Sequence, residues 1–144
     1  MYLTGSNDLV TLKGNYIHHT SGRSPKVAGN TLLHAVNNYF YANSGHAFEA
    51  DAGAKIVAEG NVFQDVKAAS QAGLAGKFFS SASNNAACKQ YLGHNCELNA
   101  YGNSVALTGA DTSILASFSG KNVAAASPAA SAKNVVNTAG YGRI

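Results

Sequence analysis

A repeat of 23 residues restricts the fold of this chain more than any other feature of the sequence. Three segments follow one another at this interval: Gly14-Asn15-Tyr16-Ile17, Asn37-Asn38-Tyr39-Phe40 and Gly60-Asn61-Val62-Phe63. A fixed period of this size is typical of a solenoid, in which each repeat forms one coil stacked on the previous coil. Apolar residues alternate over short runs bounded by Gly and Asn, as in strands rather than helices. The spaced leucines of leucine-rich repeats, which share this period, are missing. We therefore predict an all-β fold, a right-handed, single-stranded parallel β-helix of about three coils.

Asparagines recur at one bend of each predicted coil. Asn15, Asn38 and Asn61 occupy equivalent places in the repeat. Asn tolerates left-handed backbone dihedrals, and its amide both donates and accepts hydrogen bonds. The alternative is three unrelated turn asparagines. The common interval instead predicts an asparagine ladder, in which each amide bonds the next coil about 4.8 Å away.

Composition excludes several classes of protein. The chain has 144 residues, enough for one domain, with 46% hydrophobic and only 12% charged residues. This balance is typical of a folded extracellular protein rather than a disordered one. The net charge of +3 is scattered, without basic tracts interleaved with aromatics, so no nucleic-acid partner is expected. No membrane partner is expected either, because no apolar run is long enough to span a bilayer. We also expect any export signal to be absent from this chain, since no signal peptide precedes its first coil.

The repeat divides the chain into two parts of one domain. Residues 1–66 are predicted to form the β-helix coils, and residues 67–144 a loop and tail that pack on the solenoid. Cys88 and Cys96 lie in the loop, eight positions apart. A local disulfide, formed in an oxidising compartment, is the predicted state; two free thiols in a cytosolic chain are the alternative.

The tail carries two helix signals. Residues 111–118 predict a short helix, and Ser127 is expected to cap a second helix that has Pro128 at its first position. Val135 and Val136 are the apolar residues available for docking. Because a solenoid needs its terminal coil covered, we expect this tail to form a cap.

The loop of residues 18–27 is the candidate binding site. Arg23 and Lys26 flank Pro25, and the 23-residue interval places Arg23 beside His46 on one outer face. Such a pair suits an extended chain that carries acidic or ester groups. Two alternatives exist: Arg23 as a surface arginine in a turn, and His46 as a turn histidine that bonds the next coil.

A metal site is not predicted. The candidate ligands are His18, His19 and His34 together with Glu49 and Asp51, and their spacing suggests no shared centre. Two carboxylates are also too few oxygens for a calcium cage.

The chain resembles the fungal pectin lyases of polysaccharide lyase family 1 along nearly its whole length. The resemblance is densest between Leu9 and Val66 and looser in the tail. It is carried by these segments, in order: Thr11-Leu12-Lys13-Gly14-Asn15-Tyr16-Ile17, Thr20-Ser21-Gly22-Arg23-Ser24-Pro25-Lys26-Val27, Asn30-Thr31-Leu32-Leu33-His34-Ala35-Val36-Asn37-Asn38-Tyr39, Asn43-Ser44-Gly45-His46-Ala47-Phe48-Glu49 and Ala58-Glu59-Gly60-Asn61-Val62-Phe63.

The resemblance implies a pectin lyase-like β-helix that is secreted and cleaves methyl-esterified (1→4)-α-D-galacturonan by β-elimination. Arg23 then occupies the position of the arginine that removes the C5 proton, and Lys26 that of a basic residue flanking the cleft. His46 is expected to bind substrate as a neighbour of Arg23. No cofactor is expected, because the methyl ester replaces the calcium that related pectate lyases use on free carboxylates.

An arginine base conflicts with general chemistry, since guanidinium is normally protonated. Either its surroundings permit deprotonation, or Arg23 acts as a fixed donor to the enolate.

Members of that family are longer than this chain, and their earlier coils carry an aspartate, another arginine and a cleft lined with tryptophan. This chain has no Trp and resembles the C-terminal portion. We therefore expect a monomer at full length, and little lyase activity and a tendency to associate in the isolated chain. Three alternatives stay open: a non-catalytic carbohydrate-binding β-helix, a fragment without independent function, and a calcium-dependent pectate lyase.

Overall fold

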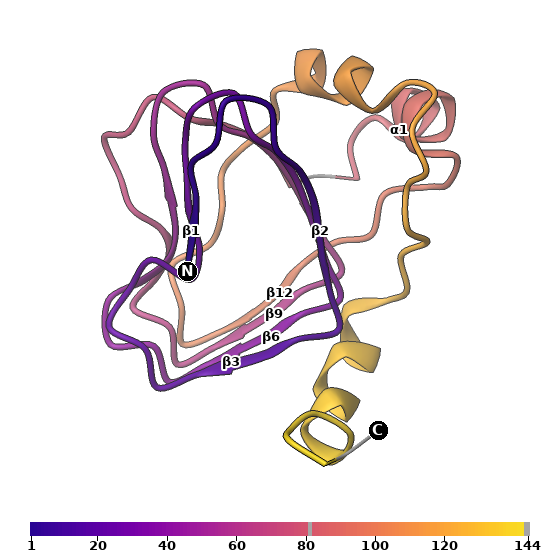
Figure 1. Cartoon of the computed structure of the whole chain (residues 1–144). Helices are drawn as coiled ribbons and strands as arrows, with labels where there is room; N and C mark the ends of the chain where they lie inside the picture. The colour runs from indigo at the N-terminus through magenta and orange to yellow at the C-terminus, as the bar shows by residue number, and fades with distance from the viewer. Residues whose placement is uncertain (81, 143–144) are drawn as a thin grey trace.

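The computed structural model describes residues 1–80 and 82–142 and shows a parallel β-helix built from three sheets (Figure 1). Each sheet has four parallel strands. Sheet 1 contains β1 (Tyr2–Leu3), β4 (Lys26–Val27), β7 (His46–Ala50) and β10 (Ala68–Ser70). Sheet 2 contains β2 (Leu9–Lys13), β5 (Leu32–Val36), β8 (Lys55–Glu59) and β11 (Lys77–Phe79). Sheet 3 contains β3 (Tyr16–His18), β6 (Tyr39–Tyr41), β9 (Val62–Gln64) and β12 (Ala100–Gly102). The predicted fold class is confirmed.

The core lies inside the coils, where side chains from all three sheets meet. Leu33 and Ile56 pair in sheet 2 and point inward, because side chains along a strand alternate between its two faces. In sheet 3, the rings of Phe40 and Phe63 stack at 4.8 Å, and Tyr101 extends the stack at 5.3 Å. A coil spacing of about 4.8 Å suits stacked aromatic rings, so the same side chain recurs in successive coils.

The asparagine ladder is present and has a fourth member. Asn15 donates to Asn38, Asn38 donates to Asn61, and Asn61 donates to Asn99, each through its backbone N–H and its side-chain amide. The left-handed backbone conformation, expected for the ladder asparagines, is found in the residues that precede them: Gly14, Asn37 and Gly60 have φ of 64°, 51° and 60°. The ladder residues therefore contribute through their amides rather than through an unusual backbone.

All three sheets gain a strand beyond residue 66. The chain between β11 and β12 leaves the coil and forms α1 (Asn85–Leu92), which begins at the Asn84 cap and ends at Gly93 in a left-handed conformation. Cys88 and Cys96 form the predicted disulfide, which joins α1 to the return segment. This disulfide loop, residues 82–99, packs its apolar side against the outer face of sheet 2.

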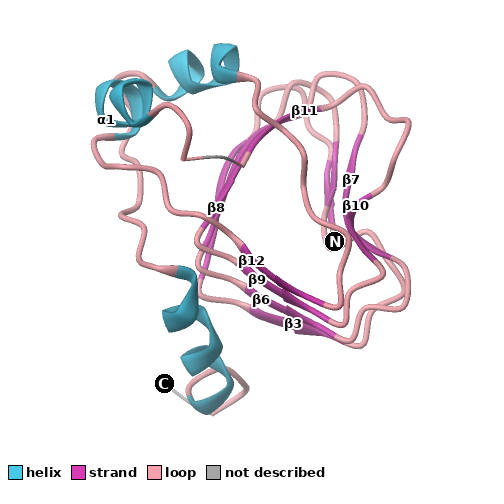
Figure 2. Cartoon of the chain, turned by 180° about the vertical axis from the view of Figure 1, so that it is seen from behind, coloured by secondary structure: helices cyan, strands magenta, loops and turns pink. Residues whose placement is uncertain are grey.

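The tail lies along the flank of the coils (Figures 1 and 2). The 3₁₀ helix η1 (Thr112–Phe118) packs against α1 and sheet 2, and Asp111 caps it by accepting from the N–H of Ser113. A second 3₁₀ helix, η2 (Ala129–Asn137), packs against sheet 3. The cap prediction for Ser127 is wrong, because Pro128 takes the N-cap position of η2 and no side chain caps this helix. The N–H and C=O of Ser127 instead pair with the side-chain amide of Asn37.

The docking residues of η2 also differ from the prediction. Ala132 is buried and Val135 is partly buried against Tyr39 and Val62, whereas Val136 stays 43% exposed. No helix in the described part of the chain has the length and apolar character that a bilayer span requires.

Candidate active site

The outer face of sheet 1 carries a group of charged side chains. Strand alternation turns Val27, Phe48 and Ala50 into the core. Lys26 and Glu49 pair in register on β4 and β7 and project from the opposite face. The 23-residue interval therefore places a cation of one coil directly against a carboxylate of the next.

Arg23 enters this group from the loop before β4. Its backbone has φ of 53°, in the left-handed region, and its side chain is 57% exposed. The guanidinium Nε lies 3.1 Å from Oε2 of Glu49. Gly45 packs against the carbonyl oxygen of Ser21, where a larger side chain would clash, so the next coil lies close beneath this loop. His46 is thereby held next to Arg23, with its Nε2 3.2 Å from the same Oε2.

Lys26 is bound more fully than Arg23. Its Nζ lies 2.6 Å from Oε1 of Glu49 and 2.6 Å from Oδ2 of Asp51. Hydrogen bonds to Asp51 and then Glu49 raise the pKa of Lys26 above its ordinary value. The hydrogen bond from Lys26 lowers the pKa of Glu49 against the opposing effect of burial, and the charge of Arg23 lowers it further. Ionised Glu49 and charged Lys26 are thus the stable states near neutral pH.

We name these five side chains the Arg23 cluster: Arg23, Lys26, His46, Glu49 and Asp51. Arg23 and His46 were predicted to be neighbours, and both lie against Oε2 of Glu49; Lys26 contacts the other oxygen of the same carboxylate. The role of Glu49 was missed, although adding 23 to the number of Lys26 identifies it as the stacked residue. Chemically, the cluster presents one exposed guanidinium, supported by a buried carboxylate, to an anionic or ester-bearing ligand.

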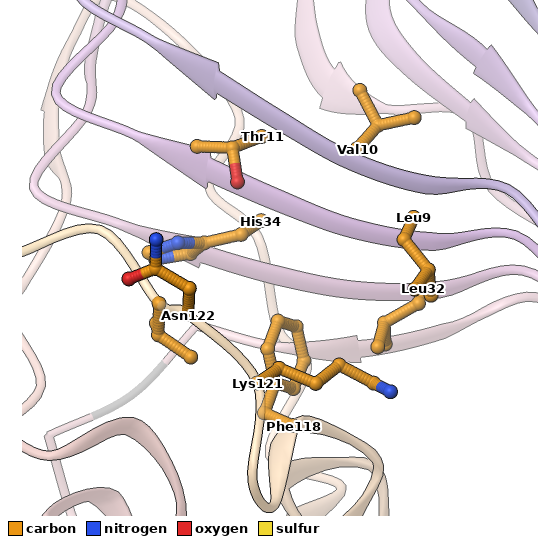
Figure 3. A pocket seen from close by; sticks show the side chains of 9 residues that line it. Leu9, Val10, Thr11, Leu32, His34, Phe118, Lys121 and Asn122 are labelled. Atoms are coloured by element: carbon orange, nitrogen blue, oxygen red, sulfur yellow. The ribbon is translucent and has the colours of Figure 1, made fainter.

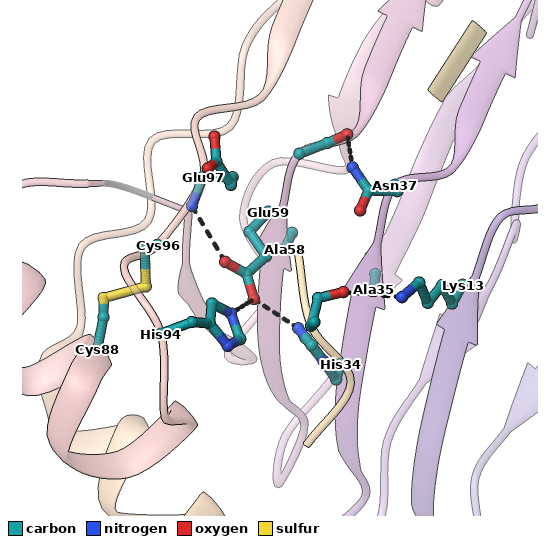
Figure 4. Close-up of polar contacts among 12 residues, drawn as sticks. Lys13, His34, Ala35, Asn37, Ala58, Glu59, Cys88, His94, Cys96 and Glu97 are labelled. Carbon is teal, nitrogen blue, oxygen red and sulfur yellow. Dashed lines mark hydrogen bonds and ion pairs between the residues drawn. A yellow bond between two sulfur atoms is a disulfide. The ribbon is translucent and has the colours of Figure 1, made fainter. Parts of the chain in front are cut away.

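The remaining histidines lie elsewhere. His34 and His94 both donate from Nε2 to Oε1 of Glu59, at 2.7 and 2.9 Å, and the N–H of Glu97 donates to Oε2 (Figure 4). This contact ties the disulfide loop to the outer face of sheet 2. The candidate metal ligands weighed from the sequence lie on different sheets: His18 on β3 of sheet 3, His34 on β5 of sheet 2 and Glu49 on β7 of sheet 1. Among residues 1–80 and 82–142, no group of three or more His, Cys, Asp or Glu side chains is arranged to hold a metal.

A pocket of about 320 Å³ also lies on sheet 2, between its outer face and the chain that follows η1 (Figure 3). Leu9, Leu32 and Phe118 supply apolar walls, and His34 and Lys121 supply polar groups. Because it belongs to a different sheet from the Arg23 cluster, the pocket is not part of the candidate active site.

Comparison with known proteins decides the family. The Pectate lyase family model matches residues 4–144. The chain belongs to the pectate lyase family. It is 64% identical over 128 residues to a probable pectin lyase A of Aspergillus fumigatus, an alignment that covers 88% of this chain and 34% of that protein.

Two relatives from Emericella nidulans align with the whole chain. The probable pectin lyase D is 56% identical and the pectin lyase B 55% identical, each over 147 residues that make up 39% of the relative. The chain therefore spans between 34% and 39% of the length of these proteins.

Proposed function

We propose that the Arg23 cluster belongs to a secreted lyase that cleaves methyl-esterified (1→4)-α-D-galacturonan. The observation that supports this most is the exposed guanidinium of Arg23 on sheet 1, in a family member whose relatives are named pectin lyases. The disulfide between Cys88 and Cys96 supports an oxidising, extracellular environment.

The proposed reaction is a β-elimination. A nitrogen of Arg23, in the deprotonated guanidine form, accepts the proton at C5 of the sugar and becomes guanidinium, which the Glu49 carboxylate stabilises. The electrons of that C–H bond form the C4–C5 double bond. The C4–O4 bond breaks, and the departing oxygen takes a proton from solvent. The methyl ester makes the C5 proton more acidic by withdrawing charge. In this scheme Lys26 and His46 contact the substrate on either side of Arg23, and their part in binding is also a proposal.

The reaction is proposed to proceed without calcium. Both carboxylates of the Arg23 cluster already bind protein cations: Glu49 contacts Arg23 and Lys26, and Asp51 contacts Lys26. A divalent ion would have to displace these contacts. Full activity in the presence of a strong calcium chelator is the expected result, and loss of activity would favour a calcium-dependent pectate lyase.

Because we expect little activity from the isolated chain, the test joins its 144 residues to the preceding coils of a relative such as the pectin lyase B of Emericella nidulans, and follows the ultraviolet absorbance of the unsaturated product on highly esterified pectin. Arg23→Ala should lower kcat about 100-fold or more, as expected for a residue that transfers the proton. Lys89→Ala, which removes an exposed cation on α1, is the matched control and should change little. Pectin binding without product from this extended protein, with Arg23 intact, would overturn the lyase proposal in favour of a carbohydrate-binding β-helix.

A further inference from the structure

Glu49 contacts every cation or potential cation of the Arg23 cluster. Its Oε2 lies 3.1 Å from Nε of Arg23 and 3.2 Å from Nε2 of His46, and its Oε1 lies 2.6 Å from Nζ of Lys26. The Glu49 side chain is only 8% exposed, and β7 fixes its backbone. A carboxylate this buried is stable only when it is paired, so its geometry and that of its partners are mutually fixed.

The manner of contact with Arg23 is informative. Glu49 contacts the guanidinium at Nε, the nitrogen nearest the aliphatic part of the Arg23 side chain. An Nε contact restrains the last torsions of a long, exposed side chain that would otherwise sample many rotamers. The Arg23 side chain is still 57% exposed, so a substrate can reach the guanidinium while Glu49 holds it.

We propose that Glu49 is a positioning residue, which holds Arg23 in the orientation required to act on a galacturonan chain. This inference rests on the proposed function for its catalytic consequence. Glu49 itself lies beneath the cations and acts on the substrate only through Arg23. Asp51 completes the arrangement by binding Lys26 from its other side, so that Lys26 does not draw Glu49 away from Arg23.

The contact is measurable without turnover. The chain contains only two arginines, Arg23 and Arg143, so its arginine Nε–H spectrum by nitrogen-15 NMR has two signals, and Arg23→Lys assigns them. Glu49→Gln should speed hydrogen exchange of the Arg23 Nε–H about tenfold, because the ion pair that holds Nε 3.1 Å from the carboxylate is lost. Glu97→Gln, which removes a carboxylate of the disulfide loop, is the control and should leave the signal unchanged.

Kinetics on esterified pectin then separate positioning from binding. Glu49→Gln should lower kcat about 10- to 100-fold with little change in KM, since a misplaced Arg23 affects the reacting geometry most. Glu49→Asp, which keeps the charge on a shorter side chain, should recover part of that loss. Thermal unfolding of each variant confirms that the coils are intact, and Glu49→Asp serves in place of Glu49→Gln if the latter does not fold.

Two outcomes are distinguishable. Absence of product from the extended protein with Arg23 and Glu49 intact defeats the proposed function, while faster exchange in Glu49→Gln still supports the positioning of Arg23. Unchanged exchange of the Arg23 Nε–H in both Glu49 variants would overturn the positioning role, whatever the turnover.

Discussion

Replacement of Asn38 by Ala should destabilise the β-helix strongly, because Asn38 and Asn61 are the two most fully connected residues of the asparagine ladder. Its Oδ1 accepts from the N–H and the Nδ2 of Asn15, at 3.0 and 2.9 Å. Its Nδ2 donates to the carbonyl of Leu12 at 2.8 Å and to Oδ1 of Asn61 at 3.0 Å. Four hydrogen bonds are therefore lost at a residue with 0% exposure.

The magnitude follows from this count. Each hydrogen bond contributes about 0.5–1.5 kcal/mol net, and buried groups left unpaired cost more, so we expect a loss of about 3–5 kcal/mol. For a chain of this length, that corresponds to a fall in Tm of roughly 10 °C or more. Thermal unfolding followed by circular dichroism measures it. Asn7→Ala removes one exposed hydrogen bond, from Asn30, and should cost no more than about 0.5 kcal/mol.

A double-mutant cycle tests the ladder itself. If Asn15 and Asn38 act together, the loss of unfolding free energy in the double variant should differ from the sum of the losses in Asn15→Ala and Asn38→Ala by about 0.5–2 kcal/mol. An Asn38→Ala variant that unfolds at the same temperature as Asn7→Ala would refute the reasoning. Strict additivity of Asn15→Ala and Asn38→Ala would refute the coupling between coils.

Two further predictions concern the attachment of the disulfide loop. Burial raises the pKa of Glu59, but hydrogen bonds from His34 and His94 outweigh it and leave the pKa below the ordinary value of 4.5. The contribution of Glu59 to the free energy of unfolding is therefore complete above its pKa in the unfolded chain. It is lost as the pH falls through the lower pKa of the folded state, so Glu59→Gln should flatten the decline of Tm below about pH 5. An acid decline as steep as that of the unmodified chain would contradict this. Reduction of the Cys88–Cys96 disulfide should cost about 2–3 kcal/mol by loop entropy, measured as the Tm difference between oxidised and reduced, alkylated chains; equal Tm values would argue against it.

The sequence predicts the coils well because the structure of a solenoid repeats at one short, fixed sequence interval. Each coil contacts mainly its neighbours, so a residue and its counterpart 23 positions later suffice to fix the register and the first three ladder residues. The fourth member, Asn99, escaped prediction because 38 positions separate it from Asn61. The motif still recurs there, since Asn99 precedes Tyr101 by two positions as Asn61 precedes Phe63.

The disulfide loop and tail were harder to predict because their structure depends on contacts distant in sequence. The sequence predicts Ser127 to be a helix cap, whereas in the structure its backbone pairs with the side chain of Asn37, 90 positions earlier. The helix α1 was missed within a segment rich in Ser and Asn, although Asn84 and Gly93 mark its two ends. Local signals identify ends of elements, whereas docking on a sheet is decided by side chains that only the fold brings together.

The Arg23 cluster shows how the same interval produces both a core and a site. Inside the coils, identical residues stack well, since amides bond amides and aromatic rings stack on aromatic rings. Outside, charges of neighbouring coils attract where their signs differ and repel where they agree. Both cases occur: Lys26 is in register with Glu49, and Lys55 is in register with Lys77. The pair of opposite sign on sheet 1 can hold its carboxylate buried, and that carboxylate is the group that Arg23, still exposed, contacts from the neighbouring loop.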